Sequence, residues 1–239
     1  MIATALSSWE YSLRRDGIEQ AIWRGDFGRA LSWHFHPKIQ IAVVLGGQRR
    51  FLTAGGPVIV NAGETFIVPA GLPHRSLGLD TGHTLSFNLY FPPAYSLCRD
   101  AIVVPTPRWL GTDIATGSEG LGDWVNDTLT RSPEGKSERA AEAIAGVLAN
   151  DHLSIGAIAS TRPMSREGFI RWFRRHVGMT PHAYRLADRL NRARALLEAD
   201  ATPAQAAVEA GFADQSHMGR NFRLAFGATP GAYRCALRA

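Results

Sequence analysis

The sequence predicts an α+β protein of two domains, with β structure in the N-terminal part and only helices in the C-terminal part. Three observations support this division. Short segments rich in β-branched and aromatic residues, separated by Gly and Pro, fill residues 18–91. After Ser137, apolar residues recur at helical spacing and the helix boundaries carry clear capping residues. The charge is also divided: residues 1–136 carry twelve basic and twelve acidic side chains, whereas the remainder carries fourteen Arg and nine Asp or Glu.

Composition limits the classes of protein to which the chain can belong. With 239 residues and 45% hydrophobic composition it can form two packed domains. The net charge of +5 lies entirely in the helical part, which indicates that this part binds a polyanion. No apolar run is long enough to span a bilayer and the first residues do not follow the order of a signal peptide, so we expect a cytoplasmic protein without a membrane partner. Cys98 and Cys235 lie in different expected domains, and they predict neither a disulfide nor a cysteine metal site.

The N-terminal part, residues 1–130, is predicted to be a β domain. Its expected strands are residues 39–45, 50–53, 58–60, 65–68 and 84–91. Many short strands at close spacing are typical of a sandwich or a barrel. Apolar residues at helical spacing then predict an amphipathic helix over 119–131, which can pack on its own domain or on a second copy of the chain. Turn-forming residues without periodicity indicate a linker over 131–136.

The C-terminal part, residues 137–239, is predicted to contain seven short helices. They cover residues 138–150, 155–161, 165–177, 181–199, 203–210, 215–226 and 230–237. Three of them follow a Thr-Pro pair, in which the hydroxyl caps the helix and the proline occupies its first position. These N-terminal caps are Thr180, Thr202 and Thr229. A left-handed cap at a helix C-terminus favours glycine, and the expected caps of this kind are Gly178, Gly211 and Gly227.

The helices over 165–177 and 215–226 each follow a short helix and a tight turn, which is the arrangement of a helix-turn-helix unit. Each has one apolar stripe to bury and one polar, Arg-rich stripe to expose. Arg171 and Arg220 stand at equivalent points of the two helices, where each can contact O6 and N7 of guanine, and Gln215 suits adenine. The expected DNA-contacting residues are Arg166, Glu167, Ile170, Arg171, Arg174, Gln215, Ser216, His217, Gly219, Arg220 and Arg223.

Some positions of the two stripes are expected to fix the helices on DNA rather than to read bases. Arg174, Arg175 and Arg223 are suited to phosphate contacts, which carry no sequence information. Gly219 has no side chain and therefore lets its helix approach the base edges or the backbone closely. The alternative interpretation, solvated faces of a helical bundle, explains neither the tandem units nor the charge asymmetry.

Five stretches of the C-terminal part carry a family resemblance. They are Phe173-Arg-Arg-His-Val-Gly178, Pro181-His-Ala-Tyr-Arg185, Arg189-Leu-Asn-Arg-Ala-Arg-Ala-Leu-Leu197, Gly211-Phe-Ala-Asp-Gln-Ser-His217 and Gly227-Ala-Thr-Pro-Gly-Ala-Tyr-Arg234. The chain resembles, over residues 137–239, the DNA-binding domain of AraC/XylS-type transcription regulators. The resemblance implies a sequence-specific regulator whose partners are double-stranded DNA and, for an activator, RNA polymerase. It also implies that the helix over 181–199 places both recognition helices in successive major grooves.

The first helix-turn-helix unit departs from the family pattern in its turn. Arg162 is a poor core residue, and the ring of Pro163 excludes a positive φ angle. We therefore expect the second unit to dominate sequence reading.

Two blocks of the N-terminal part resemble the sequence motifs of cupin barrels. The first is His34-Phe-His36 followed by Gln40, and the second begins at Gly63 and ends at His74. In metal-binding cupins the matching positions hold two His, a Glu and a later His. Here Gln40, a neutral and weak ligand, replaces the carboxylate, so the resemblance implies a cupin-like β-barrel with a polar pocket and with neither a metal nor a cofactor.

Cupin-like domains of AraC-type regulators usually bind a small effector rather than catalyse a reaction, so we expect a small-molecule effector here. The expected pocket residues are His34, His36, Gln40 and His74. Trp23, Trp33, Phe35 and Arg75 can line the pocket by position, although the three aromatic residues are more typical of a core. Two alternatives stay open: a dioxygenase-like metalloenzyme attached to a DNA-binding domain, and a platform for dimerisation and polymerase docking. The resemblance leaves the oligomeric state open between a monomer and a homodimer.

Overall fold

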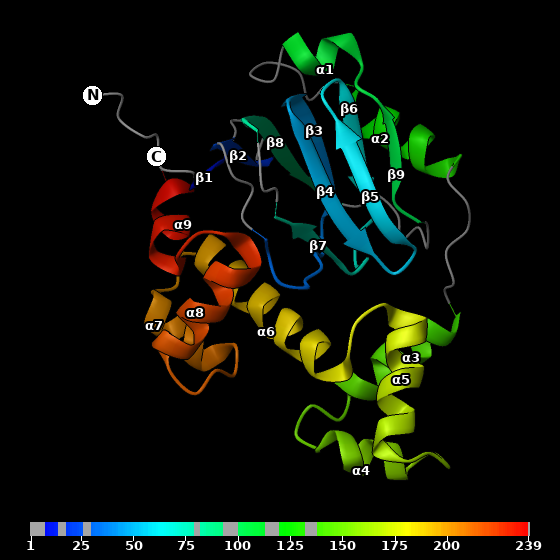
Figure 1. Cartoon of the computed structure of the whole chain (residues 1–239). Coiled ribbons are helices and arrows are strands. Elements are labelled where there is room, and N and C mark those ends of the chain that lie inside the picture. The colour runs from blue at the N-terminus through cyan, green and yellow to red at the C-terminus, as the bar shows by residue number, and fades with distance from the viewer. Residues whose placement is uncertain are drawn as a thin grey trace.

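The chain is described by a computed structural model over residues 8–13, 18–25, 30–78, 82–92, 100–112, 120–131 and 138–238. Its strands gather in one part and most of its helices in the other, as Figure 1 shows. This arrangement confirms the α+β class and its two parts. Cys98 and residues 132–136 of the expected linker lie outside the described residues, and Cys235 is an exposed free thiol.

The strands of the N-terminal domain form two antiparallel sheets. They are β1 (Ser8–Leu13), β2 (Glu19–Gly25), β3 (Ile39–Gly46), β4 (Gln48–Thr53), β5 (Gly56–Asn61), β6 (Glu64–Val68), β7 (His74–Leu77), β8 (Thr84–Phe91) and β9 (Ile102–Pro105). One sheet has the order β1-β2-β8-β3-β6-β9 and the other has the order β5-β4-β7. The five expected strands are confirmed. The expected barrel consists of two sheets, and within the described residues the strands do not close into one continuous ladder.

Apolar side chains of the two sheets meet in a shared core. Val44 and Phe66 from the larger sheet pack against Phe51 and Val60 from the smaller one, and all four are almost completely buried. Because alternate residues of a strand share a face, Arg49 points to the same side of β4 as Phe51. An arginine therefore enters the interior of the domain, where it is 5% exposed.

Two helices belong to the N-terminal domain, α1 (Arg108–Thr112) and α2 (Leu121–Thr130). The apolar stripe of α2 is buried and joins Ile41 and Ile67 of the larger sheet in one core. The helix expected over 119–131 thus packs on its own domain, which was one of the two interpretations left open.

All seven helices predicted for the C-terminal domain are confirmed. They are α3 (Glu138–Leu148), α4 (Ile155–Ser160), α5 (Arg166–Val177), α6 (Pro181–Glu198), α7 (Pro203–Glu209), α8 (Gln215–Phe226) and α9 (Pro230–Ala236). The hydroxyls of all three predicted Thr caps accept a hydrogen bond from a backbone N–H of the first turn. The three predicted glycine caps have positive φ angles between 78° and 93°. Local chemistry therefore sets these boundaries, at about 1 kcal/mol for each N-terminal cap.

The long helix α6 joins two small helical cores, as Figure 1 shows. Its N-terminal half packs with α3, α4 and α5, and its C-terminal half packs with α7, α8 and α9. Each core therefore contains one helix-turn-helix unit. Both cores also include side chains of the N-terminal domain, Phe35 in the first and Tyr11 and Tyr90 in the second.

Candidate DNA interface and buried histidine pocket

In the first unit, helix α5 begins at its cap Ser165, whose hydroxyl accepts from the N–H of Gly168 at 3.0 Å. Phe169, Phe173 and Val177 recur at helical spacing and are buried. The opposite face carries the predicted DNA-contacting residues of this helix. Four of these residues are exposed, namely Arg166, Glu167, Arg171 and Arg174, and the fifth, Ile170, is half-buried.

In the second unit, helix α8 begins at Asp214, whose carboxylate accepts from the N–H of His217 at 2.6 Å. Met218 and Phe222 are completely buried behind it. The predicted contact residues Gln215, Ser216, Arg220 and Arg223 are exposed, whereas His217 and Gly219 are half-buried. A Cβ atom at Gly219 would meet nothing within 4 Å, so the fold itself does not require a glycine at this position.

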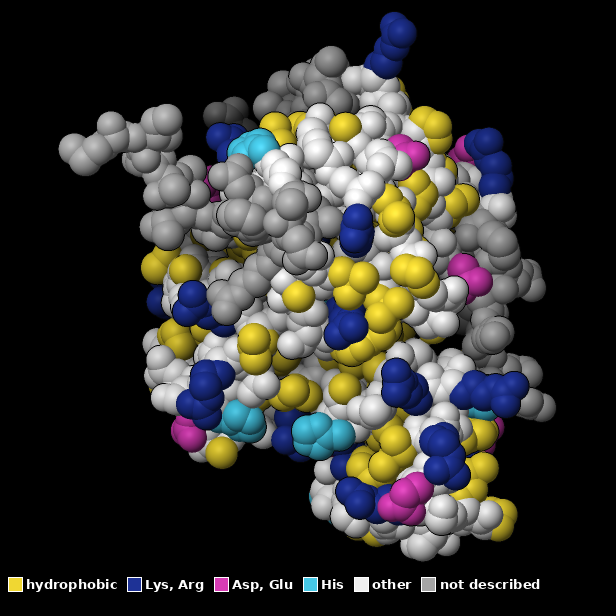
Figure 2. Space-filling model, in the orientation of Figure 1, with side chains coloured by type: hydrophobic (Ala, Val, Ile, Leu, Met, Phe, Trp, Pro, Cys, Tyr) yellow, Lys and Arg dark blue, Asp and Glu magenta, His cyan; other side chains and the backbone are white. Residues whose placement is uncertain are grey.

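The exposed arginines of the two helices differ from the other arginines of the domain in their partners. Among the described residues, none of Arg171, Arg174, Arg220 and Arg223 forms an ion pair. By contrast, three arginines of α6 surround the single carboxylate of Asp151, namely Arg185, Arg189 and Arg192. Figure 2 shows basic side chains gathered over the helical half of the molecule. Unpaired guanidinium groups on two recognition helices are suited to contact phosphates and guanine edges.

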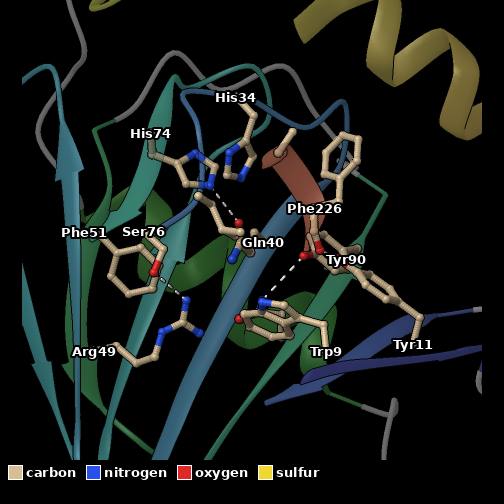
Figure 3. Close-up of a pocket in the computed structure, with 13 residues that line it drawn as sticks. Trp9, Tyr11, His34, Gln40, Arg49, Phe51, His74, Ser76, Tyr90 and Phe226 are labelled. Carbon is tan, nitrogen blue, oxygen red and sulfur yellow. Dashed lines mark hydrogen bonds between the residues drawn. The ribbon is translucent and has the colours of Figure 1, made fainter. Parts of the chain in front are cut away.

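The pocket of the N-terminal domain is drawn in Figure 3, with His34 and His74 at its upper end and Arg49 at its lower end. The imidazole Nδ1 of His34 lies 2.7 Å from the carbonyl of Ser32, and Nδ1 of His74 lies 2.9 Å from the carbonyl of Leu72. Because a carbonyl oxygen only accepts, Nδ1 carries the proton in both rings.

Three of the four predicted pocket residues line this pocket, and the fourth lies beside them. His34, Gln40 and His74 are lining residues, and the Gln40 amide lies 2.8 Å from Nε2 of His74. His36 is buried next to them, with ring centroids 4.9 Å apart between His34 and His36. Ligand atoms of the three histidines lie within 4.8 Å of one another, which is the spacing that a metal ion bridges.

The histidines do not fit a metal in this arrangement. The guanidinium of Arg194 donates to Nδ1 of His36 at 2.9 Å, and a guanidinium has no acceptor. In neutral His36 the proton therefore lies on Nε2, which has no hydrogen-bond partner in the described part of the chain and no free lone pair for a cation. With its proton on Nδ1, neutral His74 has an acceptor at Nε2, so the side-chain amide of Gln40 must turn its NH2 group to this nitrogen and occupy its lone pair. Arg49 and Arg194 add positive charge, and no Asp or Glu of the described segments lines the pocket.

All three imidazoles are held in the neutral form. Burial lowers the pKa of His34 well below its ordinary value, and the nearby His74 and Arg194 lower it further. Burial, His34 and Arg194 do the same to the pKa of His36. Burial also lowers the pKa of His74, to about 4. The cluster is therefore a set of uncharged polar groups in a positive environment.

Comparisons with known proteins match both domains. Residues 148–236 match a family model described as a helix-turn-helix domain, and residues 24–83 match one described as a cupin domain. The probable transcriptional regulator LumQ of Photobacterium leiognathi is 24% identical over 236 residues, which is 88% of this chain and 94% of LumQ. The arabinose operon regulatory protein of Salmonella typhimurium is 27% identical over 111 residues, 46% of this chain and 40% of that protein. The chain is thus similar, over both of its domains, to transcription regulators of the AraC/XylS type.

Solved structures show the same two-domain fold. ToxT of Vibrio cholerae O395 superposes on 93% of the regulator and 99% of its own chain, with a TM-score of 0.60 and 10% sequence identity. The match to the cupin model covers the β-rich part of the chain, and the match to the helix-turn-helix model covers the helical part. No helix among the described residues is long and apolar enough to cross a membrane.

The two domains of the regulator are joined by a buried ion pair. Arg194 of α6 pairs with Glu19 of β2, and both are less than 5% exposed. Although burial alone would lower the pKa of Arg194, Glu19 raises it well above the ordinary value. Around the pair, the Tyr233 hydroxyl accepts from Arg194 at 3.0 Å and donates to Glu198 at 2.8 Å. This network ties the middle of α6 to the N-terminal domain.

A second set of contacts holds the C-terminal end of α8. The N–H of Ser32 donates to the carbonyl of Leu224 at 2.8 Å, and the Tyr11 hydroxyl donates to the carbonyl of Phe226 at 2.7 Å. The Phe226 ring enters the pocket, with its centroid 5.9 Å from that of His34. Helix α8 thus carries predicted DNA contacts near its start and a wall of the sensor pocket at its end.

The residues suggested as further pocket lining lie elsewhere, and several residues that do line the pocket were not predicted. Trp23 and Phe35 are buried, and Phe35 stacks on Tyr184 of α6 with centroids 4.6 Å apart. The guanidinium of Arg75 lies 5.7 Å from the Trp33 ring. None of these lines the pocket. The missed lining residues include Trp9, Arg49, Tyr90 and Phe226. A local signal existed for Arg49, which stands one residue before the predicted strand 50–53 and alternates with the inward Phe51, and for Tyr90, which lies in the predicted strand 84–91.

Proposed function

We propose that the regulator reads duplex DNA with the exposed faces of α5 and α8, and that a small molecule in the N-terminal pocket changes how α8 is presented. The observation that carries the first part is the row of unpaired arginines on both recognition helices. Helix α6 has 18 residues and is therefore about 27 Å long, a length comparable to one turn of B-DNA. The open position at Gly219 supports a close approach of α8 to DNA.

The second part is supported by the contacts between the pocket and α8. Phe226 belongs both to the pocket wall and to the recognition helix, so a change in one affects the other. ToxT, which shares the fold, has been solved with an unsaturated fatty acid bound. A fold that accepts a small molecule in one member supports an effector site in this one.

The remaining partners and boundaries follow from this function. We infer a sensor domain over residues 1–130, a linker over 131–136 and a DNA-binding domain over 137–239, acting in the cytoplasm. If a homodimer forms through α2, it uses the exposed face of this helix, since the apolar face is buried in its own domain. If the regulator is an activator, RNA polymerase is its further partner. We propose no enzymatic role for the histidine cluster, because His36 and His74 do not offer free ligand atoms.

Selection of bound fragments from random genomic DNA tests the proposal directly, because it yields the site and the spacing of its half-sites. Binding is expected to weaken as salt rises, since phosphate contacts release counterions. Arg220→Ala is expected to relax specificity at one base pair at a cost of about 1–3 kcal/mol. Arg192→Ala on the exposed side of α6 is the matched control and should change neither property. Equal binding of all fragments by the wild-type chain would contradict the proposal.

A further inference from the structure

Arg49, the buried arginine of the N-terminal domain, lacks the partner that the buried arginine of α6 has. Arg194 is paired with Glu19, whereas Arg49 is equally buried and has no carboxylate partner among the described residues. The guanidinium of Arg49 donates to the hydroxyls of Ser76 at 3.0 Å and Ser86 at 3.2 Å. Both acceptors are neutral, so the positive charge is buried without compensation, which is costly.

The aromatic groups around this charge cover it but do not neutralise it. The Arg49 guanidinium carbon lies 5.0 Å from the centroid of the Trp9 ring and 4.7 Å from that of Phe51. Burial lowers the pKa of Arg49 to about 10, so the group stays protonated at neutral pH. A permanent cation at the end of a closed pocket is the arrangement that attracts an anion.

The rest of the lining has the same preference. Figure 3 shows Arg49 facing the same space as Gln40 and the histidines. Besides Arg49, the described part of the chain lines the pocket with neutral hydrogen-bonding groups and with aromatic and aliphatic side chains, and contributes no acidic residue. The positive charge that disfavours a metal ion in this pocket therefore favours an organic anion with an apolar body.

The pocket has no room for such a ligand while α8 is docked. The space left between the side chains is about 10 Å³, which is no more than one water molecule needs. Ala225 and Phe226 at the end of α8 and Trp9 of β1 fill the remainder. Trp9 is itself held against α8, since a Cβ atom at Gly227 would lie 2.2 Å from its ring. A ligand larger than water must therefore move the end of α8.

We propose that the effector is a small organic carboxylate that pairs with Arg49 and displaces Phe226, so that ligand binding and the docking of α8 exclude each other. This inference rests on the proposed effector-dependent function and names the chemistry of its ligand. It makes the second recognition helix the moving part, because Phe226 and the predicted base-reading Arg220 belong to one short rigid helix.

Thermal unfolding of the full chain with hexanoate, decanoate and benzoate tests the ligand class, with the matching alcohols as neutral probes. At least one acid is expected to raise Tm, and its alcohol is not. Arg49→Met is expected to fold, with a Tm no lower than that of the wild type, and to lose the acid-dependent shift. Arg50→Met is the control: Arg50 is the exposed neighbour on the other face of β4, so it should keep the shift.

The same titration tests the displacement of α8. Phe226→Ala removes the ring that fills the pocket. It is expected to tighten acid binding about tenfold, because displacing α8 from the N-terminal domain then costs less free energy. Leu224→Ala, an exposed position of the same turn, should leave the affinity unchanged. Weaker or unchanged acid binding by Phe226→Ala would overturn the displacement.

The outcomes separate this inference from the proposed function. An acid shift that survives Arg49→Met overturns the anion site. A Tm shift with the alcohols alone also overturns the anion site, but it leaves the proposal of a small-molecule effector intact. No shift with any probe overturns the carboxylate inference, and salt-sensitive binding of selected genomic fragments by the same preparation would show that the DNA-binding proposal holds independently.

Discussion

The two helix-turn-helix units share their caps but differ in their turns and in what holds their recognition helices. Helices α5 and α8 both begin at a side-chain cap and end at a glycine with positive φ. The second turn contains Gly211 at φ 81°, whereas the first has no positive φ angle in its sequence Thr161-Arg-Pro-Met164. Arg162 instead leaves the core and lies over the Trp172 ring at 4.9 Å. The first turn therefore has a different backbone conformation from the second, while α5 remains a regular helix.

The larger difference lies at the far ends of the two helices. Helix α8 ends inside the sensor pocket, with two of its last carbonyls bonded to the N-terminal domain. Helix α5 shares a core with Phe35 and Trp33 of that domain and approaches Ala54 at Gly178, where a Cβ atom would lie 2.8 Å from that of Ala54, but no side chain of α5 lines the pocket. The two helix-turn-helix units thus differ in their contacts with the pocket. The pocket contains side chains of the second unit and none of the first, so we expect an effector to act mainly on the second.

The largest expected effect comes from breaking the ion pair that ties α6 to the sensor. Arg194→Met leaves the buried Glu19 carboxylate with Lys38, 3.4 Å away, as its remaining partner. Because breaking a buried pair costs about 3–5 kcal/mol when no partner is left, we expect a loss of unfolding free energy near the lower end of this range, about 3 kcal/mol. Arg192→Met removes the pairs of a half-exposed guanidinium with Asp188 and Asp151 and should cost at most about 1 kcal/mol. Denaturant unfolding measures both. Similar losses in the two variants would mean that the docking of the second half contributes little.

Acid is expected to release the second half before the first. The His74 pKa is about 4 in the folded chain and about 6.5 in the unfolded chain, so the unfolded state binds more protons between these values. Stability is therefore present above pH 6.5 and is lost as pH falls towards 4, by about 3 kcal/mol for this residue. The lowered pKa values of His34 and His36 act in the same direction.

Hydrogen exchange at decreasing pH measures this release helix by helix. Amides of α8, which contacts the histidines through Phe226, should lose protection at a higher pH than those of α5. His182→Gln is the control, since this histidine is exposed at the start of α6 and its loss should leave the profile unchanged. Simultaneous loss of protection in both helices would argue against separate coupling of the second unit.

Affinity for DNA gives the next comparison. Arg171→Ala and Arg220→Ala remove side chains at equivalent points of the two units, and each should cost about 1–3 kcal/mol if both read a base. We expect the larger loss of specificity for Arg220→Ala. Binding to single-base variants of the selected site measures it. A larger loss for Arg171→Ala would reverse the ranking of the two units and would show that the rebuilt first turn does not weaken its helix.

Local structure was predictable wherever short-range chemistry decides it. The Thr-Pro caps and the glycine caps fixed the ends of the helices, and alternation identified the central strands. Strand β7 was missed because His74–Leu77 is short and polar, and it forms a strand only through pairing with β4. The edge strand β9 is four residues long and pairs with β6 across the sheet. Neither carries a periodic signal of its own.

The pocket was only partly predictable because it is assembled from distant segments. His34, Gln40 and His74 were found through their spacing, but their surroundings were not. Phe226 reads as an ordinary core residue of α8, and nothing near it in the sequence indicates that its ring enters another domain. The ion pair between Glu19 and Arg194 was hidden for the same reason, since the two residues meet only after both domains have folded.

The smallest expected effect contrasts the two turns themselves. Gly211→Ala places a Cβ atom at φ 81°, and the nearest side-chain atom, Nε of Arg189, would be 3.7 Å away. Space is therefore sufficient, and the cost is the left-handed conformation alone, about 1–2 kcal/mol. Pro163→Ala in the first turn needs no change of conformation and should cost about 0.4–1 kcal/mol, through the greater freedom of the unfolded chain. Thermal unfolding of the two variants compares them. If Pro163→Ala lowers Tm more than Gly211→Ala does, the first turn depends on its proline as strongly as the second turn depends on its glycine.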